Sequence, residues 1–210
     1  MTSKPATGRK QSWKPANLLA PIPAVLVSCG GTPGWAPNII TIAWIGSVCS
    51  DPVMLSISVR PERYSHDIIS ATGEFVVNLP SAAQAHAVDW CGMVSGRTAD
   101  KFAGANLSPA AALRLSCPIV AECPLNIECR VHQRVALGSH TLFLAKVLAV
   151  QVDSALVDAK GRLRLDRAGL LAFGHGEYFA LGRRLGRFGF SVRRRRRKSM
   201  LPAHGRPSRR

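Results

Sequence analysis

Residues 38–70, NIITIAWIGSVCSDPVMLSISVRPERYSHDIIS, decide the fold of this chain. Residues 39–45 are β-branched and aromatic, and they run into a polar turn at Gly46. This pattern predicts a strand. Residues 53–59, VMLSISV, alternate aliphatic residues with Met and Ser, which predicts a second strand after Asp51-Pro52. One face of this strand is aliphatic, and the other is free to meet a polar group.

Residues 60–69, RPERYSHDII, follow the second strand and predict a short helix. Tyr64 or Ser65 is the expected N-cap, so that the first backbone amides of the helix face an anion. Arg60, Arg63 and the Ser65 hydroxyl would complete this anion site.

Six words of the sequence, in this order, resemble the flavin reductase-like family, nearest to its flavoredoxin and ferric-reductase-like branch. They are NIITIAW (38–44), SVCSDP (47–52), SVRPERYSHDII (58–69), GEFVVNLP (73–80), CGMVSGRTADKFA (91–103) and ECPLNIECRV (122–131). The resemblance extends from about residue 17 to 191. It implies a mainly β fold with short helices (α+β), namely an FMN-binding split β-barrel of the Greek-key type.

The resemblance also implies where FMN binds. Arg60 and Ser65 would hold the phosphate, while Thr41, Ser47 and the backbone from Ile42 to Cys49 would hold the ring and the ribityl chain. The remaining expected cofactor-binding residues are Asn38, Trp44, Val48, Ser58, Asn78, Lys101 and Phe173, and the expected catalytic residue is His140.

Several of these residues also have ordinary structural interpretations. Asn78 ends a predicted strand and could equally satisfy a backbone group there. Lys101 could be an exposed lysine, and Trp44 could be a core aromatic residue. His140 follows Gly138-Ser139 in the turn of a predicted hairpin between residues 125–131 and 141–152, where it could bond the backbone.

The expected chemistry belongs to the flavin, because the chain has neither a dinucleotide-binding GxGxxG motif nor a P-loop. Residues 29–34, CGGTPG, have the wrong spacing. Electrons would pass from NADH or NADPH through FMN to free flavin, ferric complexes or a partner redox protein. An alternative is a flavoredoxin-like electron carrier with little NAD(P)H oxidase activity. The resemblance further implies a homodimer.

The net charge of +16 lies at the two ends of the chain. Residues 191–210 hold nine Lys or Arg, residues 183–187 hold three, and residues 1–14 hold four, whereas residues 15–182 hold twelve against twelve acids. We therefore expect a disordered basic N-terminus (1–16), one flavin reductase-like domain (17–191) and a disordered basic tail (192–210). A second alternative function, nucleic-acid binding, would act through this tail alone.

Cysteine usage and hydropathy predict a cytoplasmic protein without a metal site. The six cysteines lack zinc or iron–sulfur spacing, which favours reduced and buried thiols, with Cys49 near the flavin as the exception. The apolar stretch 18–29 imitates a signal sequence, but Pro21 and Pro23 interrupt it. No other stretch reaches the roughly 18 unbroken apolar residues of a membrane span.

Overall fold

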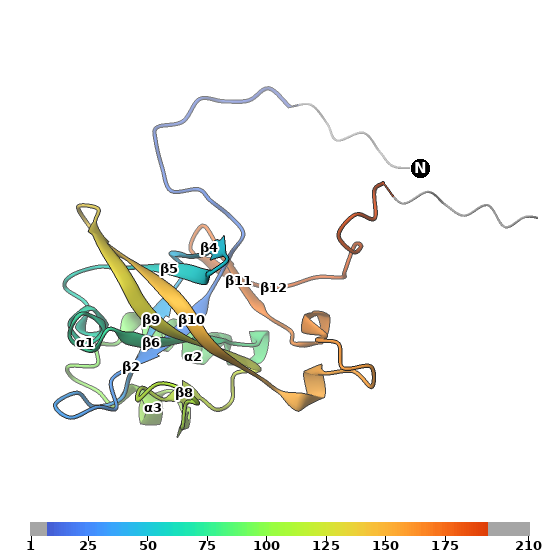
Figure 1. The fold of residues 1–210 in the computed structure, drawn as a ribbon. Coiled ribbons are helices and arrows are strands. Elements are labelled where there is room, and N and C mark those ends of the chain that lie inside the picture. Colours follow the sequence, from blue (N-terminus) through green and yellow to red (C-terminus); the bar gives the residue numbers. More distant parts are fainter. Residues whose placement is uncertain (1–7, 193–210) are drawn as a thin grey trace, which may run out of the picture.

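A curved antiparallel sheet of seven strands forms the centre of the computed structural model, which describes residues 8–192 (Figure 1). Its strands, in spatial order, are β3 (Asn38–Ile42), β2 (Val25–Cys29), β6 (Glu74–Leu79), β9 (Leu125–Ala136), β10 (Thr141–Val152), β5 (Val53–Val59) and β4 (Ile45–Ser50). The mainly β fold with short helices is confirmed. Because β3 and β4 lie at opposite ends of this order, the sheet is not closed into a barrel.

The chain bends sharply between β3 and β4, where a single strand over residues 39–45 was expected. Strand β3 ends at Ile42, and the Ile45 amide donates to the Ala43 carbonyl at 3.0 Å. The Ser58 amide of β5 donates to the Trp44 carbonyl at 2.9 Å, which fixes the bend against the neighbouring strand. The bend therefore carries the chain from one end of the sheet to the other and leaves Trp44 at the corner.

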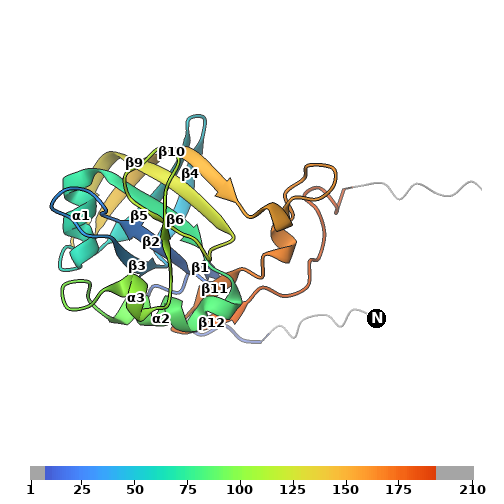
Figure 2. The ribbon, with the colours of Figure 1, turned by 90° about the horizontal axis from the view of Figure 1, so that it is seen from below.

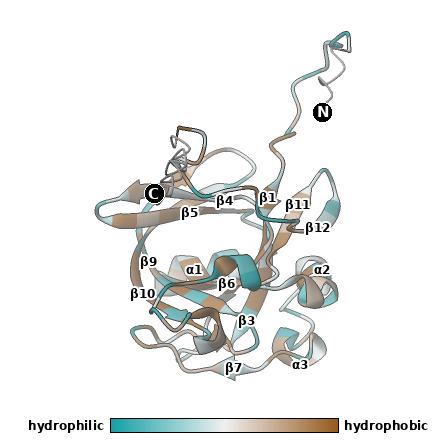
Figure 3. Cartoon of the chain, turned by 90° about the vertical axis from the view of Figure 1, so that its right-hand side faces the viewer, coloured by the Kyte–Doolittle hydropathy of each residue, from teal (hydrophilic) through white to brown (hydrophobic). Residues whose placement is uncertain are grey.

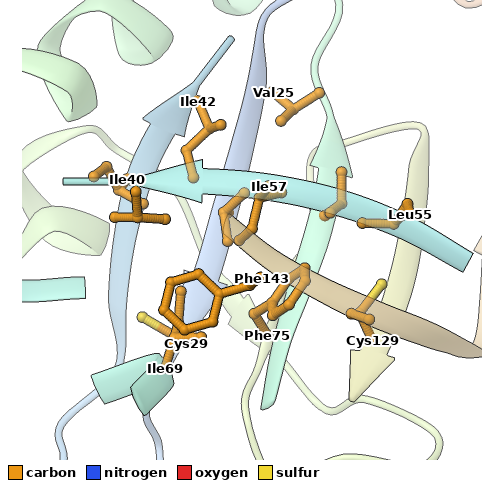
Figure 4. Close-up of a cluster of buried hydrophobic side chains, with 14 of the residues drawn as sticks. Val25, Cys29, Ile40, Ile42, Leu55, Ile57, Ile69, Phe75, Cys129 and Phe143 are labelled. Carbon is orange, nitrogen blue, oxygen red and sulfur yellow. The ribbon is translucent and has the colours of Figure 1, made fainter. Parts of the chain in front are cut away.

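The main core lies inside the curve of the sheet (Figure 4). Ile57, Ile69, Phe75 and Phe143 are fully buried there, on β5, α1 (Tyr64–Thr72), β6 and β10. Each such side chain contributes about 1.5–3 kcal/mol on leaving water. Along β5 the buried residues alternate with half-buried ones, as its sequence predicts.

Helix α1 begins at Tyr64, and the residue at its N-cap differs from the one expected from the sequence. Arg63 occupies the N-cap position with extended backbone, so neither Tyr64 nor Ser65 does. The Ser65 side chain is instead buried and accepts a hydrogen bond from Asn38 Nδ2 at 2.7 Å. Gly73 ends the helix with φ of 69°, a left-handed conformation that glycine adopts without strain.

Two helices cover the outer face of β2 and β3 and enclose a second core cluster (Figure 2). A short 3₁₀ turn (Ala82–Gln84), capped by Ser81, leads into α2 (Ala85–Met93). The Ser81 amide donates to Gln84 Oε1 at 2.8 Å and so completes a capping box at the start of this turn. The short helix α3 (Lys101–Gly104) follows, and its N-cap Asp100 accepts from two backbone amides.

A small second sheet packs beside α2 and completes the architecture. It has the order β1 (Ile22–Pro23), β11 (Leu171–Gly174), β12 (Glu177–Ala180), while β7 (Pro109–Ala110) pairs with β8 (Ile119–Val120). Two 3₁₀ turns, η2 (Ser154–Leu156) and η3 (Leu165–Arg167), join β10 to β11. The hydropathy view shows hydrophobic residues concentrated on the strands (Figure 3).

The expected terminal segments lie largely outside the described residues. Residues 8–16 are exposed and contain no helix or strand, whereas residues 1–7 and the tail from residue 193 are not described. In the described part of the chain, no helix combines the length and hydropathy needed to cross a membrane. All six cysteines are free thiols, and five of them are buried, as expected, with Cys49 exposed.

Candidate functional site

Two adjoining cavities lie between the open side of the sheet and helix α2. The larger has a volume of about 450 Å³ and the smaller about 170 Å³. Ile40, Arg63 and Gly92 line both, so the cavities form one continuous site. Volumes of about 300–1,000 Å³ are typical of cofactor sites.

Aromatic side chains from distant parts of the chain border the larger cavity. The Trp44 ring, at the β3–β4 bend, stacks on the His140 ring of the β9–β10 turn with centroids 5.9 Å apart and planes 14° apart. Phe173 on β11 meets Tyr178 on β12 edge-on, with centroids 5.3 Å apart. Trp44 is 47% exposed, so it is not the core residue of the alternative interpretation. This cavity can accept a flat aromatic ligand.

Strands β3 and β5 and helix α2 supply the polar and aliphatic lining of the same cavity. The Thr41 hydroxyl donates to the Val88 carbonyl of α2, and Ser58 lies on the half-buried face of β5. A Cβ atom at Gly92 would come within 3.3 Å of Thr41 Cβ, so glycine allows α2 to approach β3 closely. The lining residues with no predicted role are Ala24, Ile40, Val59, Asp89, Gly92, Met93 and Tyr178.

The smaller cavity carries the groups suited to an anion. Arg63, Ser65, Ser95 and Lys101 line it, together with the first turn of α1 and the single carboxylate of Glu62. Helix N-termini attract anions because their first backbone amides lack partners within the helix. A Cβ atom at Gly96 would fall 2.1 Å from Asn38 Oδ1, so this glycine is needed for the loop to close over Asn38.

Lys101 is a buried cation in this smaller cavity, which excludes the exposed-lysine interpretation. Its side chain is 3% exposed, and its Nζ donates to the Cys91 carbonyl. The pKa of Lys101 is lowered to about 8, mainly by burial and to a small extent by the Arg63 charge, against the opposite influence of the neighbouring Cys91 and Cys29. A bound anion would therefore stabilise the charged form of Lys101.

The two arginines of the predicted anion site separate in the structure. Arg63 lines both cavities, whereas Arg60 lines only the larger one. Arg60 is exposed and pairs with Glu62 at 3.4 Å. The assignment of Arg60 to the phosphate therefore stays a prediction, and Arg63 is the arginine that lines the smaller cavity. The sequence allowed either arginine to line this cavity, because both lie just before the start of α1.

Four of the predicted residues lie outside both cavities. Ser47, Val48 and Cys49 are exposed on β4, the end strand of the sheet. Asn78 is fully buried in β6, where its amide donates to the Leu26 carbonyl at 3.0 Å and accepts from the Val120 amide at 2.9 Å. Of its two interpretations, backbone pairing is the one that the structure contains.

Ten of the expected cofactor-binding and catalytic residues line the joined cavities, and these are Asn38, Thr41, Ile42, Trp44, Ser58, Arg60, Ser65, Lys101, His140 and Phe173. Asp89 and Tyr178 were missed. Their positions on α2 and β12 gave no signal, because a polar residue on a helix surface and an aromatic residue in a strand are both common. Burial, with the Asp89 charge as a smaller influence, raises the pKa of Tyr178 to about 12, so its hydroxyl stays protonated.

FMN, with its planar ring and its phosphate, fits this set of residues. The phosphate needs cations and N–H or O–H donors, which the smaller cavity supplies. The ring needs a flat apolar space with a few polar groups, which the larger cavity supplies.

Comparison with known proteins identifies a matching protein family and similar solved structures. The family model for the flavin reductase like domain matches residues 19–182. The structure resembles the flavoredoxin of Desulfovibrio vulgaris (Miyazaki F) with a TM-score of 0.82 and 29% identity, covering 88% of this chain and 100% of that one.

Two curated relatives extend the comparison. An uncharacterized protein of Archaeoglobus fulgidus is 33% identical over 124 residues, which cover 59% of this chain and 70% of the relative. The FMN reductase (NADH) RutF of Stutzerimonas stutzeri is 27% identical over 112 residues, which cover 52% of this chain and 61% of the relative.

Proposed function

The chain belongs to the flavin reductase-like family, and on this premise we propose that it is an FMN-binding oxidoreductase that passes electrons from NADH or NADPH onward. The acceptor would be free flavin, a ferric complex or a partner redox protein. One observation carries the proposal: an aromatic-bordered cavity of about 450 Å³ is continuous with a small cavity that holds Arg63, Ser65 and Lys101.

In this proposal the smaller cavity binds the FMN phosphate. Arg63 and Lys101 supply the positive charge, while Ser65 and the first amides of α1 supply hydrogen-bond donors. The Lys101 ammonium is already buried, so little side-chain freedom is lost when the phosphate arrives. Asn38 positions Ser65 through the 2.7 Å hydrogen bond to its hydroxyl oxygen.

The larger cavity then receives the ribityl chain and the ring. Thr41 and Ser58 present hydroxyl groups, Ile42 presents backbone groups, and Trp44 and Phe173 border the ring. Bound FMN would supply the redox chemistry, because taking up a hydride and releasing electrons are properties of the flavin itself. The protein orients the ring and limits the access of water.

His140 is the side chain to which we assign proton handling. One of its ring nitrogens, Nδ1, lies 2.9 Å from the Ser139 hydroxyl, so Nε2 is the nitrogen left for a ligand. Its stacking on Trp44 holds the ring at the edge of the cavity. The two ring nitrogens of an imidazole can donate and accept a proton, which suits proton exchange with a reduced cofactor or a substrate.

A second candidate function is electron carriage with little NAD(P)H oxidase activity. The similarity to a flavoredoxin over its whole length favours this alternative. The two candidates share the FMN site and differ in how fast NADH or NADPH reduces the bound flavin.

The proposal includes a cytoplasmic homodimer. Val48, Val53 and Trp44 are exposed near the β4–β5 end of the sheet, where an apolar surface suits a subunit interface. The five buried free thiols suit a reducing compartment. Sedimentation of the protein at two concentrations tests the dimer, and a monomer throughout would contradict it.

An absorption spectrum of FMN-loaded protein before and after anaerobic NADH or NADPH tests the function. Rapid bleaching by either nucleotide, followed by reoxidation with free FMN or a ferric chelate, is the result expected of a reductase. Slow bleaching by both nucleotides, with fast reduction by dithionite, would indicate the carrier.

A further inference from the structure

The described part of the chain has an uneven distribution of charge. Residues 158–187 contain seven Lys or Arg and three acids, whereas residues 15–157 contain eight Lys or Arg and nine acids. A concentration of one sign on one side of a protein steers partners of the opposite sign toward that side. The positive side is built from η3, its flanking loops and the segment that follows β12.

The seven basic residues of this region form what we call the basic surface: Lys160, Arg162, Arg164, Arg167, Arg183, Arg184 and Arg187. Two contacts bring its two segments together. Arg184 Nη1 lies 3.9 Å from Asp166 Oδ2, and the Leu181 amide donates to the Leu170 carbonyl at 3.3 Å. The segment after β12 therefore runs alongside residues 166–170, as the two ribbon views also show (Figures 1 and 2).

Much of the charge on the basic surface is not neutralised within the described residues. Asp158 pairs with Arg162 at 3.1 Å, and Asp166 is shared between Arg164 and Arg184. The other four cations have no carboxylate within ion-pair distance among residues 8–192. The basic surface thus offers free positive charge to a partner.

Apolar side chains are interspersed with these arginines. Leu181, Leu185 and Phe188 are exposed on the same segment, with Phe188 in full contact with solvent. Arginine and aromatic side chains together are typical of protein interfaces.

The β11–β12 hairpin links the basic surface to the candidate flavin site. Strands β11 and β12 carry Phe173 and Tyr178, which line the larger cavity, and the chain leaves the other end of the hairpin, at Ala180, into the arginine segment. A partner docked there would lie at one end of the hairpin whose side chains border the cavity.

We propose that the basic surface docks an acidic, one-electron redox protein that accepts electrons from the bound flavin. This inference rests on the proposed function, and it assigns the acceptor and its docking surface. One fully reduced FMN gives up two electrons and two protons, so it reduces two ferric centres to the ferrous state. Electron-transfer complexes of this kind are small, weak and steered by charge.

The experiment uses the full chain and an acidic rubredoxin as the probe. FMN-loaded protein is reduced with stoichiometric dithionite, so that the result does not depend on NADH or NADPH, and mixed rapidly with ferric rubredoxin. The test variant is Arg183→Ser, Arg184→Ser, Arg187→Ser. The matched control is Lys14→Ser, Arg114→Ser, Lys146→Ser, which removes the same charge elsewhere. Reduction of ferricyanide, a small acceptor, checks the flavin in each variant.

We expect the test variant to reduce rubredoxin about tenfold more slowly at low salt, with the control variant close to wild type. The wild-type rate should fall with added salt, and ferricyanide reduction should be equal in all three proteins. Equal rubredoxin rates in the test and control variants, or no reduction by wild type, would overturn the inference. A test variant that reduces rubredoxin as fast as the wild type but no longer binds duplex DNA would also overturn it. Failure to retain FMN would instead contradict the proposed function.

Discussion

Replacing Lys101 by Met tests the cationic half of the site. The change keeps most of the buried volume but removes the charge that we assign to the FMN phosphate. A hydrogen bond to a charged group contributes about 1.5–3 kcal/mol, so FMN should bind about 10–150-fold more weakly. The protein should remain folded, because the lowered pKa of Lys101 means that burial disfavours its charge.

The pH dependence of FMN binding gives a second measure of the same residue. In the free protein Lys101 is half protonated near pH 8, so fewer molecules carry the ammonium as the pH rises. The wild-type affinity should fall by about tenfold between pH 7 and pH 9, because the FMN phosphate, with a second pKa near 6, keeps its charge in that range.

Titration of FMN fluorescence measures both effects, with Lys146→Met as the control. The Lys101→Met variant should show a flat profile from pH 7 to pH 9. An unchanged FMN affinity in this variant, or the same pH profile as wild type, would refute the assignment of Lys101 to the phosphate.

Three further predictions follow from buried and exposed groups. Asn78→Ala should lower the free energy of unfolding by about 3 kcal/mol in urea titrations, because it leaves the Val120 amide unpaired, while FMN affinity stays unchanged. Trp44→Ala should weaken FMN binding by about 0.5–1.5 kcal/mol in the same fluorescence titration, and an unchanged affinity would exclude Trp44 from the ring site. Stability should fall above pH 9, because burial raises the pKa of Cys29, Cys123 and Cys129 to about 12 while the unfolded thiols ionise near 9. Each thiol lowers the free energy of unfolding by about 1.4 kcal/mol per pH unit above that value, while Lys101, whose lowered pKa acts in the opposite direction between about pH 8 and pH 10.5, offsets about one of the three thiols; a constant urea midpoint from pH 8 to pH 10 would contradict this.

The strands and the hairpin were predictable from the sequence because their patterns are local. Alternation in residues 53–59 and the apolar stretches beside Gly138 specify strands without reference to the rest of the chain. The bend at Ala43-Trp44 was not predictable, because it depends on the Ser58 amide of another strand.

The site was predictable only in part, for a similar reason. Short sequence motifs predicted that Ser65, Lys101 and His140 belong to the site. They did not predict which neighbouring residues line the same cavities. Asn78 was ambiguous because its partner, the Val120 amide, is 42 residues away in sequence. Asp89 and Tyr178 enter the cavity only because α2 and β12 pack against the sheet.

The central claim is that the joined cavities bind FMN. The most direct measurement is the absorption spectrum of the protein after incubation with FMN and removal of free flavin by gel filtration. The account predicts a yellow protein with one FMN per chain, and less flavin in an Arg63→Gln, Lys101→Met variant. A colourless wild-type protein after this treatment would contradict it.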